Sequence, residues 1–136
     1  MKGSVPLLFL SFLVLLIAIA LACGASPPQR TLQSITLAPA TADANGEPVQ
    51  FTATGIYNTQ PIQVTPQSAT WGACYQNAST TDVSVTSNGL AQCASGAMGT
   101  FTVFAYDTVG QVCSGSVTAC GGGGCYVTGT AQLTCP

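Results

Sequence analysis

Histidine is missing from this chain, and charged side chains are scarce: two lysine or arginine residues stand against four acidic residues in 136. Without histidine the chain lacks both the commonest general base and the commonest metal ligand. A net charge of −2 provides no basic surface for nucleic acid or for anionic lipid head groups. We therefore expect no cofactor, no metal site and no nucleic-acid partner, and we predict that the protein is not an enzyme.

The few groups that remain for chemistry are poorly placed for it. Asp43 and Glu47 belong to a predicted turn, Asp82 precedes a predicted strand and Asp107 ends one. No two of these carboxyl groups are spaced as an acid–base pair, and a calcium site at a domain end is their alternative use. The glycine run at 121–124 lacks the lysine and the helix that accompany a phosphate-binding loop. We expect this run to form a hairpin tip.

An uninterrupted run without charge, residues 5–22, follows Lys2 and ends in small residues. Such a stretch is typical of a signal peptide, and it is slightly short for a membrane span of about 20 residues. Ala20-Leu21-Ala22-Cys23-Gly24 resembles a bacterial lipoprotein box, which implies that Cys23 becomes the lipid-carrying N-terminus. Cleavage without lipidation and an uncleaved membrane anchor at 1–22 are the alternatives. All three predict export, and Gly24 implies the outer membrane by the same resemblance.

The rest of the chain consists of short runs in which apolar and polar residues alternate, separated by Gly, Pro and Asn turns. This period-2 alternation is typical of half-buried strands, and no segment has a helical period of useful length. We predict an all-β fold, a two-sheet sandwich of about seven strands over residues 31–136, after a tether at 23–30. The expected strands cover residues 32–38, 49–57, 69–74, 83–85, 89–93, 99–107 and 126–135.

Trp71 is the only tryptophan of the chain, and it lies in a short apolar and β-branched run at 69–74. A large aromatic residue in such a run is expected to fill the middle of a small β core. We therefore predict that the other strands pack around Trp71 and bury it.

Five short patterns follow one another between Leu32 and Tyr106. They are SITLAPA at 34–40, VQFTATG at 49–55, ATW at 69–71, VSV with GLA at 83–85 and 89–91, and GTFTV at 99–103. Their succession resembles the bacterial immunoglobulin-like group 2 family. The resemblance implies a β-sandwich of bacterial surface proteins, including adhesins of the intimin and invasin kind, that serves as a stalk, spacer or binding module. The chain departs from the family in having a single domain and many cysteines.

Seven cysteines are present, one at the end of the leader and six in the β-rich part. An even set in an exported chain predicts disulfides, and the spacings, without histidine, do not fit a zinc site. Where the family turns directly into its last strand, this chain has an insert at 108–124. Six cysteines allow 15 pairings. The pairs that we predict are Cys74–Cys93, Cys120–Cys125 and Cys113–Cys135.

Phe104 and Tyr106 are expected on the outer face of their strand, next to the cysteine-rich insert, with which Tyr126 is grouped. They form either a binding surface or a small satellite core under the insert. We predict an exported, lipid-anchored, non-enzymatic module for adhesion or structural support in the cell envelope. Its partners are the membrane and an unidentified protein or glycan. The alternative is a secreted binding or inhibitor module that uses the disulfide-pinned loop 108–124.

Overall fold

The computed structural model describes residues 28–108, 120 and 126–136, and these ranges contain strands and turns but no helix. The predicted all-β fold is therefore confirmed for this part of the chain. None of its segments is a helix long and apolar enough to cross a membrane. The leader at 1–22 and Cys23 lie outside the described residues.

The described residues form eleven strands, and the longer ones lie where the alternation of the sequence predicts them. Their bounds are β1 Leu32–Ala38, β2 Thr41–Asp43, β3 Val49–Gln50, β4 Thr52–Tyr57, β5 Gln63–Val64, β6 Thr70–Tyr75, β7 Ala78–Ser79, β8 Val83–Val85, β9 Leu90–Cys93, β10 Gly99–Thr108 and β11 Tyr126–Cys135. The short strands β5 and β7 occupy stretches that the sequence suggests are a loop and a turn.

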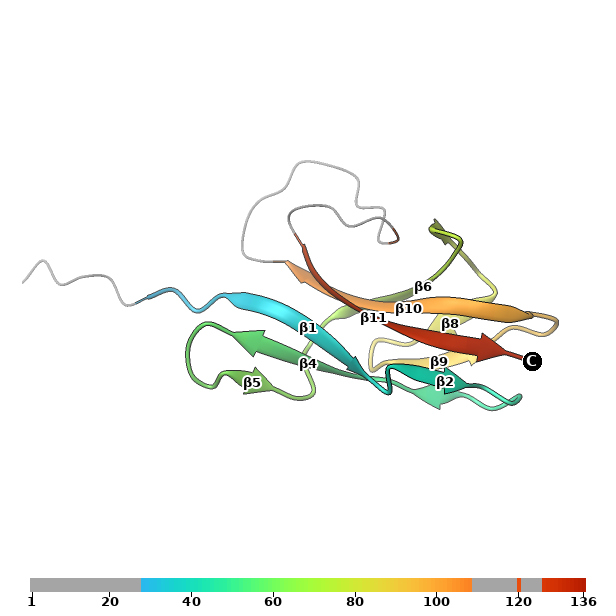
Figure 1. Cartoon of the computed structure of the whole chain (residues 1–136), viewed down its shortest axis with the longest axis horizontal. Helices are drawn as coiled ribbons and strands as arrows, with labels where there is room; N and C mark the ends of the chain where they lie inside the picture. Colours follow the sequence, from blue (N-terminus) through green and yellow to red (C-terminus); the bar gives the residue numbers. More distant parts are fainter. Residues whose placement is uncertain (1–27, 109–119, 121–125) are drawn as a thin grey trace, which may run out of the picture.

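One layer is a five-stranded sheet with the order β2-β11-β10-β6-β7. Its centre is the antiparallel pair β10 and β11, which stays in register from Gly99 opposite Cys135 to Thr108 opposite Tyr126. Strand β2 is parallel to β11, and the remaining neighbours are antiparallel. Figure 1 shows β10 and β11 side by side along the length of the domain. This hairpin is the frame on which the other strands are arranged.

The second layer is built from two three-stranded sheets, β1-β4-β5 and β3-β9-β8. Phe51 lies between β3 and β4, and its backbone N–H donates a hydrogen bond of 2.9 Å to the carbonyl oxygen of Gly89. This bond continues the pairing of β3 with β9, so residues 49–57 connect the two sheets into one layer. The arrangement of the two layers is consistent with a β-sandwich.

The core lies between the layers and is made by alternate residues of both. The large side chains that are fully buried are Phe51, Phe101, Val103 and Leu133. Trp71 is only partly buried and packs against the margin of this core, so the prediction that it fills the centre is wrong. The reason is its place at the start of β6, beside the loop at 65–69, where a pocket adjoins its side chain.

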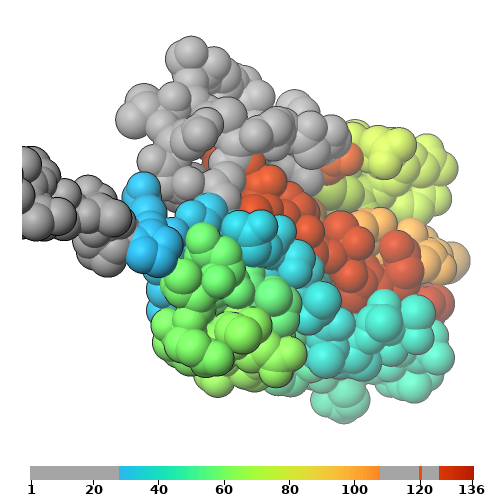
Figure 2. All heavy atoms as spheres, turned by 60° about the vertical axis from the view of Figure 1, so that its left-hand side comes forward, coloured from blue at the N-terminus to red at the C-terminus, as the bar shows by residue number. Residues whose placement is uncertain are grey.

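The described chain begins at one end of the domain, where β1 starts, and its C-terminus lies at the opposite end (Figure 1). Figure 2 looks toward the first of these ends, and the residues of β4 and β5 lie there against β1. The pairing of β1 with β4, from Leu32 opposite Tyr57 to Ala38 opposite Thr52, holds this part together.

Candidate functional site

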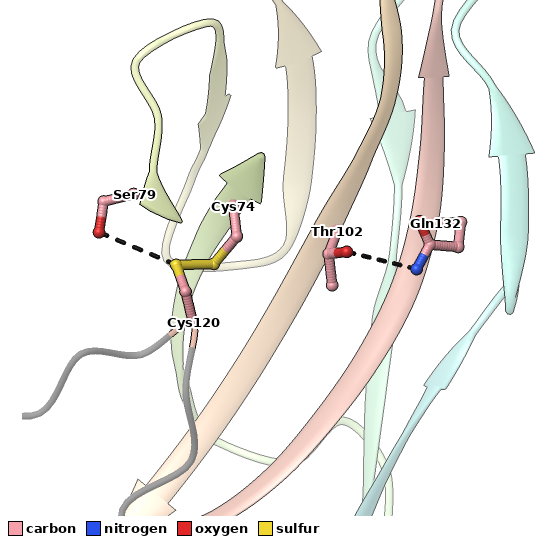
Figure 3. The surroundings of a disulfide bond; sticks show 5 residues. All are labelled: Cys74, Ser79, Thr102, Cys120 and Gln132. Carbon is pink, nitrogen blue, oxygen red and sulfur yellow. Dashed lines mark hydrogen bonds between the residues drawn. A yellow bond between two sulfur atoms is a disulfide. The ribbon is translucent and has the colours of Figure 1, made fainter. Parts of the chain in front are cut away.

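Among the described residues, two disulfide bonds stabilise the domain on different faces of the five-stranded sheet. Cys93 at the end of β9 is bonded to Cys135 at the end of β11, with their Cα atoms 5.9 Å apart. Since β9 and β11 belong to different layers, this bond crosses the core. Cys74 of β6 is bonded to Cys120, with a Cα–Cα distance of 5.8 Å. Figure 3 shows this second bond, with the Cys120 Sγ 3.9 Å from the Ser79 Oγ.

The predicted pairing of Cys74 with Cys93 is wrong, and strand geometry explains why. Cys74 lies opposite Thr102, on the face turned away from the core, whereas Cys93 is close to the core. Two cysteines on opposite faces of the layers cannot form a bond. The predicted pairs Cys120–Cys125 and Cys113–Cys135 are also wrong, because Cys120 and Cys135 have the partners given above. Cys113 and Cys125 themselves lie outside the described residues.

The three aromatic residues predicted to gather beside the insert do lie together. The ring centroids of Phe104 and Tyr106 are 6.0 Å apart, and those of Tyr106 and Tyr126 are 5.2 Å apart in an edge-to-face arrangement. Phe104 is buried, with 6% of its surface exposed, and the two tyrosines are partly buried. Gly72 of β6 lies directly beneath Phe104: a Cβ atom at this glycine would be 2.3 Å from the Phe104 Cζ.

This burial bears on the two uses predicted for the aromatic cluster at Phe104 alone. Phe104 has almost no surface left for a partner, and its ring packs on the backbone of Gly72. It is therefore a packing residue, as expected of a satellite core. Binding through Tyr106 and Tyr126 stays a prediction.

A pocket of about 310 Å³ opens beside Trp71, at the margin of the core. It lies between β4, the loop at 65–69 and the turn that connects β8 to β9. Ala53 and Pro66 contribute apolar surface, and Ser68 and Asn88 contribute polar groups. None of the nine lining residues is ionisable. The volume is at the lower end of the range for small-molecule sites, which begins at about 300 Å³.

The loop at 65–69 is fixed by the side chain of Gln67, the one buried polar residue of the described part. Its Nε2 donates to the Asp107 Oδ2 at 3.1 Å and to the Ser68 carbonyl oxygen at 3.0 Å. Its Oε1 accepts a hydrogen bond of 2.8 Å from the Tyr57 hydroxyl. The Gln67 backbone N–H donates to the Ala53 carbonyl oxygen at 2.8 Å. One wall of the pocket is thereby tied to β4 and β10.

The opposite wall is the turn between β8 and β9, which is fixed as well. Gly89 adopts φ +85°, a left-handed conformation that favours glycine, and the benzo edge of Trp71 lies against its Cα. A Cβ atom here would be 2.4 Å from the Phe51 carbonyl oxygen and 2.9 Å from the Trp71 Cζ2. The Gln50 Nε2 donates to the Asn88 carbonyl oxygen at 2.7 Å. The Thr86 hydroxyl donates to the Asn88 Oδ1.

Sequence reasoning missed this pocket because it assigned Trp71 to the core. The available signals were the turn residues Asn88 and Gly89 and the irregular stretch before Trp71, both of which interrupt strands. Neither signal indicates that the two segments meet at the tryptophan, since they are separated by about 20 residues of chain. In the fold, the turn is attached to residues 49–57 by the Phe51–Gly89 hydrogen bond and the loop by the Gln67–Ala53 hydrogen bond.

Neither the comparison with protein-family models nor the comparison with curated proteins finds a match for this chain. The described residues include no group of three or more His, Cys, Asp or Glu side chains that is able to hold a metal ion. The two disulfides indicate an oxidising environment, extracellular or periplasmic.

Proposed function

We propose that this protein is an exported, non-enzymatic module of the bacterial cell envelope, held at the membrane by lipid on Cys23 and acting in adhesion or structural support. The observation that carries the proposal is the disulfide between Cys93 and Cys135, which joins the two layers. A bond of this kind persists only in an oxidising compartment, and the leader at 1–22 supplies a route there.

The strand order supports an immunoglobulin-like assignment. In immunoglobulin constant-type domains one sheet has the order A-B-E-D and the other contains C, F and G. Here β1, β3 with β4, β9 and β8 follow the first order, and β6, β10 and β11 follow the second. Trp71 lies on the strand that corresponds to C, which is where immunoglobulin domains carry their tryptophan. This order supports the resemblance to the bacterial group 2 family.

A binding or structural role is supported over catalysis by the composition of the chain. There is no histidine, and a serine or threonine nucleophile without a base has no group to activate it. Asp107, one of the four acidic residues, accepts a hydrogen bond from the buried Gln67 and so contributes to packing.

The anchoring is tested by comparing the full-length chain with its Cys23→Ser variant in a bacterial host. We expect the natural chain in the outer-membrane fraction and the variant in the soluble periplasm or the medium, because lipidation requires the Cys23 sulfur. Ser26→Ala is the matched control and leaves the distribution unchanged. Membrane retention of the Cys23 variant would show instead that the leader itself is the anchor.

The alternative function, a secreted binding or inhibitor module that uses loop 108–124, is favoured by one observation. The Cys74–Cys120 bond attaches this loop to β6. A variant in which residues 109–125 are replaced by a short turn, together with Cys74→Ala, separates the two functions. An inhibitor loses its binding in this variant, whereas an envelope module keeps its attachment or packing role.

A further inference from the structure

Several polar groups around the Trp71 pocket have no hydrogen-bond partner within the described part of the chain. They are the Trp71 Nε1–H, the Asn88 Nδ2 and the hydroxyls of Ser68 and Ser87. No side-chain nitrogen or oxygen that is buried in these ranges lacks a partner. Ser68, Ser87 and Asn88 are exposed and Trp71 is partly buried, so the four groups remain available to a ligand.

The pocket also presents an aromatic side chain without any charge beside it. Trp71 stands between the fixed loop at 65–69 and the fixed turn at Asn88, so its ring has a defined orientation. An anionic ligand such as a phosphate or a carboxylate finds no cation among the lining residues. A purely apolar ligand leaves the polar groups of Ser68, Ser87 and Asn88 without partners, which costs binding energy.

We propose that this pocket binds one ring of a neutral saccharide. A sugar ring has an apolar face of C–H groups, which suits the negative face of an indole, and a periphery of hydroxyl groups that donate and accept hydrogen bonds. Trp71 supplies the aromatic contact, and Ser68, Ser87 and Asn88 supply the neutral polar contacts. The 310 Å³ volume suits one or two rings and is too small for a long peptide segment.

This inference rests on the proposed function and names the class of its ligand, a neutral glycan of the envelope or of another cell surface. The pocket walls are held by hydrogen bonds from Gln50 and Gln67, so little ordering is needed on binding. A single small pocket is expected to bind weakly, with a Kd of about 1 mM. Many lipid-anchored copies on one surface then bind a multivalent glycan much more tightly.

The fluorescence of Trp71 provides a specific test, because the chain has no other tryptophan. The oxidised, purified full chain is titrated with glucose, galactose, mannose, N-acetylglucosamine and their disaccharides. Sialic acid serves as the charged counterpart. We expect a saturable change in emission with at least one neutral sugar and none with sialic acid, at up to about 100 mM, where a site with a Kd of about 1 mM is saturated.

Two substitutions locate the binding at the pocket. Asn88→Asp retains the oxygen that accepts from Thr86 but removes the Nδ2 donor and adds a charge, and Ser68→Ala removes a hydroxyl. Each substitution is expected to raise the Kd about fivefold or more, because it removes roughly one hydrogen bond. Ser84→Ala on β8 is the matched control, because Ser84 is exposed and does not line the pocket. Thermal melting confirms that all three variants fold.

The outcomes separate this inference from the proposed function. Absence of any emission change with all neutral sugars, or equal binding by Asn88→Asp and the wild type, overturns the saccharide site and leaves the envelope role in place. Sugar binding by a protein that is not exported supports the site and overturns the envelope role. Saturable binding of a proline-rich or aromatic peptide without sugar binding would identify a peptide site and contradict the proposal.

Discussion

At the scale of single residues, the tightest packing around a glycine of the described chain is that of the Phe104 ring on Gly72. Phe104 is on the outer face of the five-stranded sheet, only 6% of its surface is exposed, and its ring lies across a glycine. Any side chain at position 72 displaces the ring. The satellite core therefore requires glycine at this point of β6, although glycine in a strand interior is otherwise unfavourable.

A double-mutant cycle tests this dependence. Gly72→Ala alone is expected to destabilise the domain by about 1–3 kcal/mol, the usual cost of overpacking. Phe104→Ala alone removes buried aromatic surface and costs about 3–5 kcal/mol. With Phe104→Ala already present, Gly72→Ala is expected to be neutral or stabilising, since the ring that it meets is gone. Urea unfolding of the four proteins measures the coupling, and additive effects would contradict the contact.

Gln67 is the second residue on which local structure depends. Gln67→Leu keeps the size of the side chain but removes its bonds to Tyr57 and Asp107, and we expect a loss of about 1–3 kcal/mol in the free energy of unfolding. Tyr57→Phe, which removes one of these bonds, is expected to cost about 0.5–1.5 kcal/mol. Denaturant titration ranks the two variants. A Gln67→Leu protein as stable as the wild type would show that the network does not hold the loop.

Trp71 illustrates what composition alone does not reveal at this scale. A lone tryptophan in a strand indicates a core position, and its partial exposure depends on how the loop at 65–69 and the turn at Asn88 close around it. Both segments are irregular, so no periodic pattern predicts their positions. The aromatic cluster on β10 and β11 was predictable, because strand alternation alone places Phe104 and Tyr106 on one face.

At the scale of strands, the disulfides are the main stabilising links. The Cys93–Cys135 bond closes a loop of 42 residues and the Cys74–Cys120 bond one of 46, by sequence separation. The chain-entropy relation gives about 4 kcal/mol for each loop of this length. We expect the Cys93→Ala/Cys135→Ala double variant to lose about 3–4 kcal/mol of unfolding free energy. Calorimetry under non-reducing conditions measures this.

The Cys74→Ala/Cys120→Ala double variant is the comparison for that experiment. The Cys74–Cys120 bond closes a loop of similar length, but it joins the outer face of β6 to Cys120. The two-layer arrangement therefore does not depend on this bond. We expect this variant to keep the near-ultraviolet circular dichroism of the packed aromatic side chains. Loss of the layered fold in this variant, with the Cys93→Ala/Cys135→Ala variant unaffected, would contradict this. It would show that the Cys74–Cys120 bond, and not the Cys93–Cys135 bond, holds the two layers together.

Strand positions were largely predictable, and cysteine partners were not. The predicted strands at 32–38, 83–85 and 126–135 match β1, β8 and β11, because alternation is a local property that follows from the pleat. Pairing depends on which face each cysteine occupies and on which layer its strand joins. Cys93 and Cys135 belong to strands that meet only in the folded sandwich. Proximity in the sequence is a poor guide to such contacts.

At the scale of the whole molecule, the proposed anchor limits how far the domain reaches. The chain between Cys23 and the start of β1 spans at most about 30 Å when fully extended. β1 starts at one end of the domain and the C-terminus lies at the other (Figure 1). Lipidation at Cys23, as proposed, would therefore keep the domain within a short distance of the membrane. This geometry favours contacts within the envelope over reach to a distant surface.

The most direct test of the account is non-reducing mass spectrometry of the protein isolated from the envelope of its own cells. We predict a mature N-terminus at Cys23 that carries a diacylglyceryl group. The same digest is expected to contain linked peptides for Cys74–Cys120 and Cys93–Cys135. An intact Met1 together with free thiols at Cys93 and Cys135 would contradict both the export and the clamped two-layer fold.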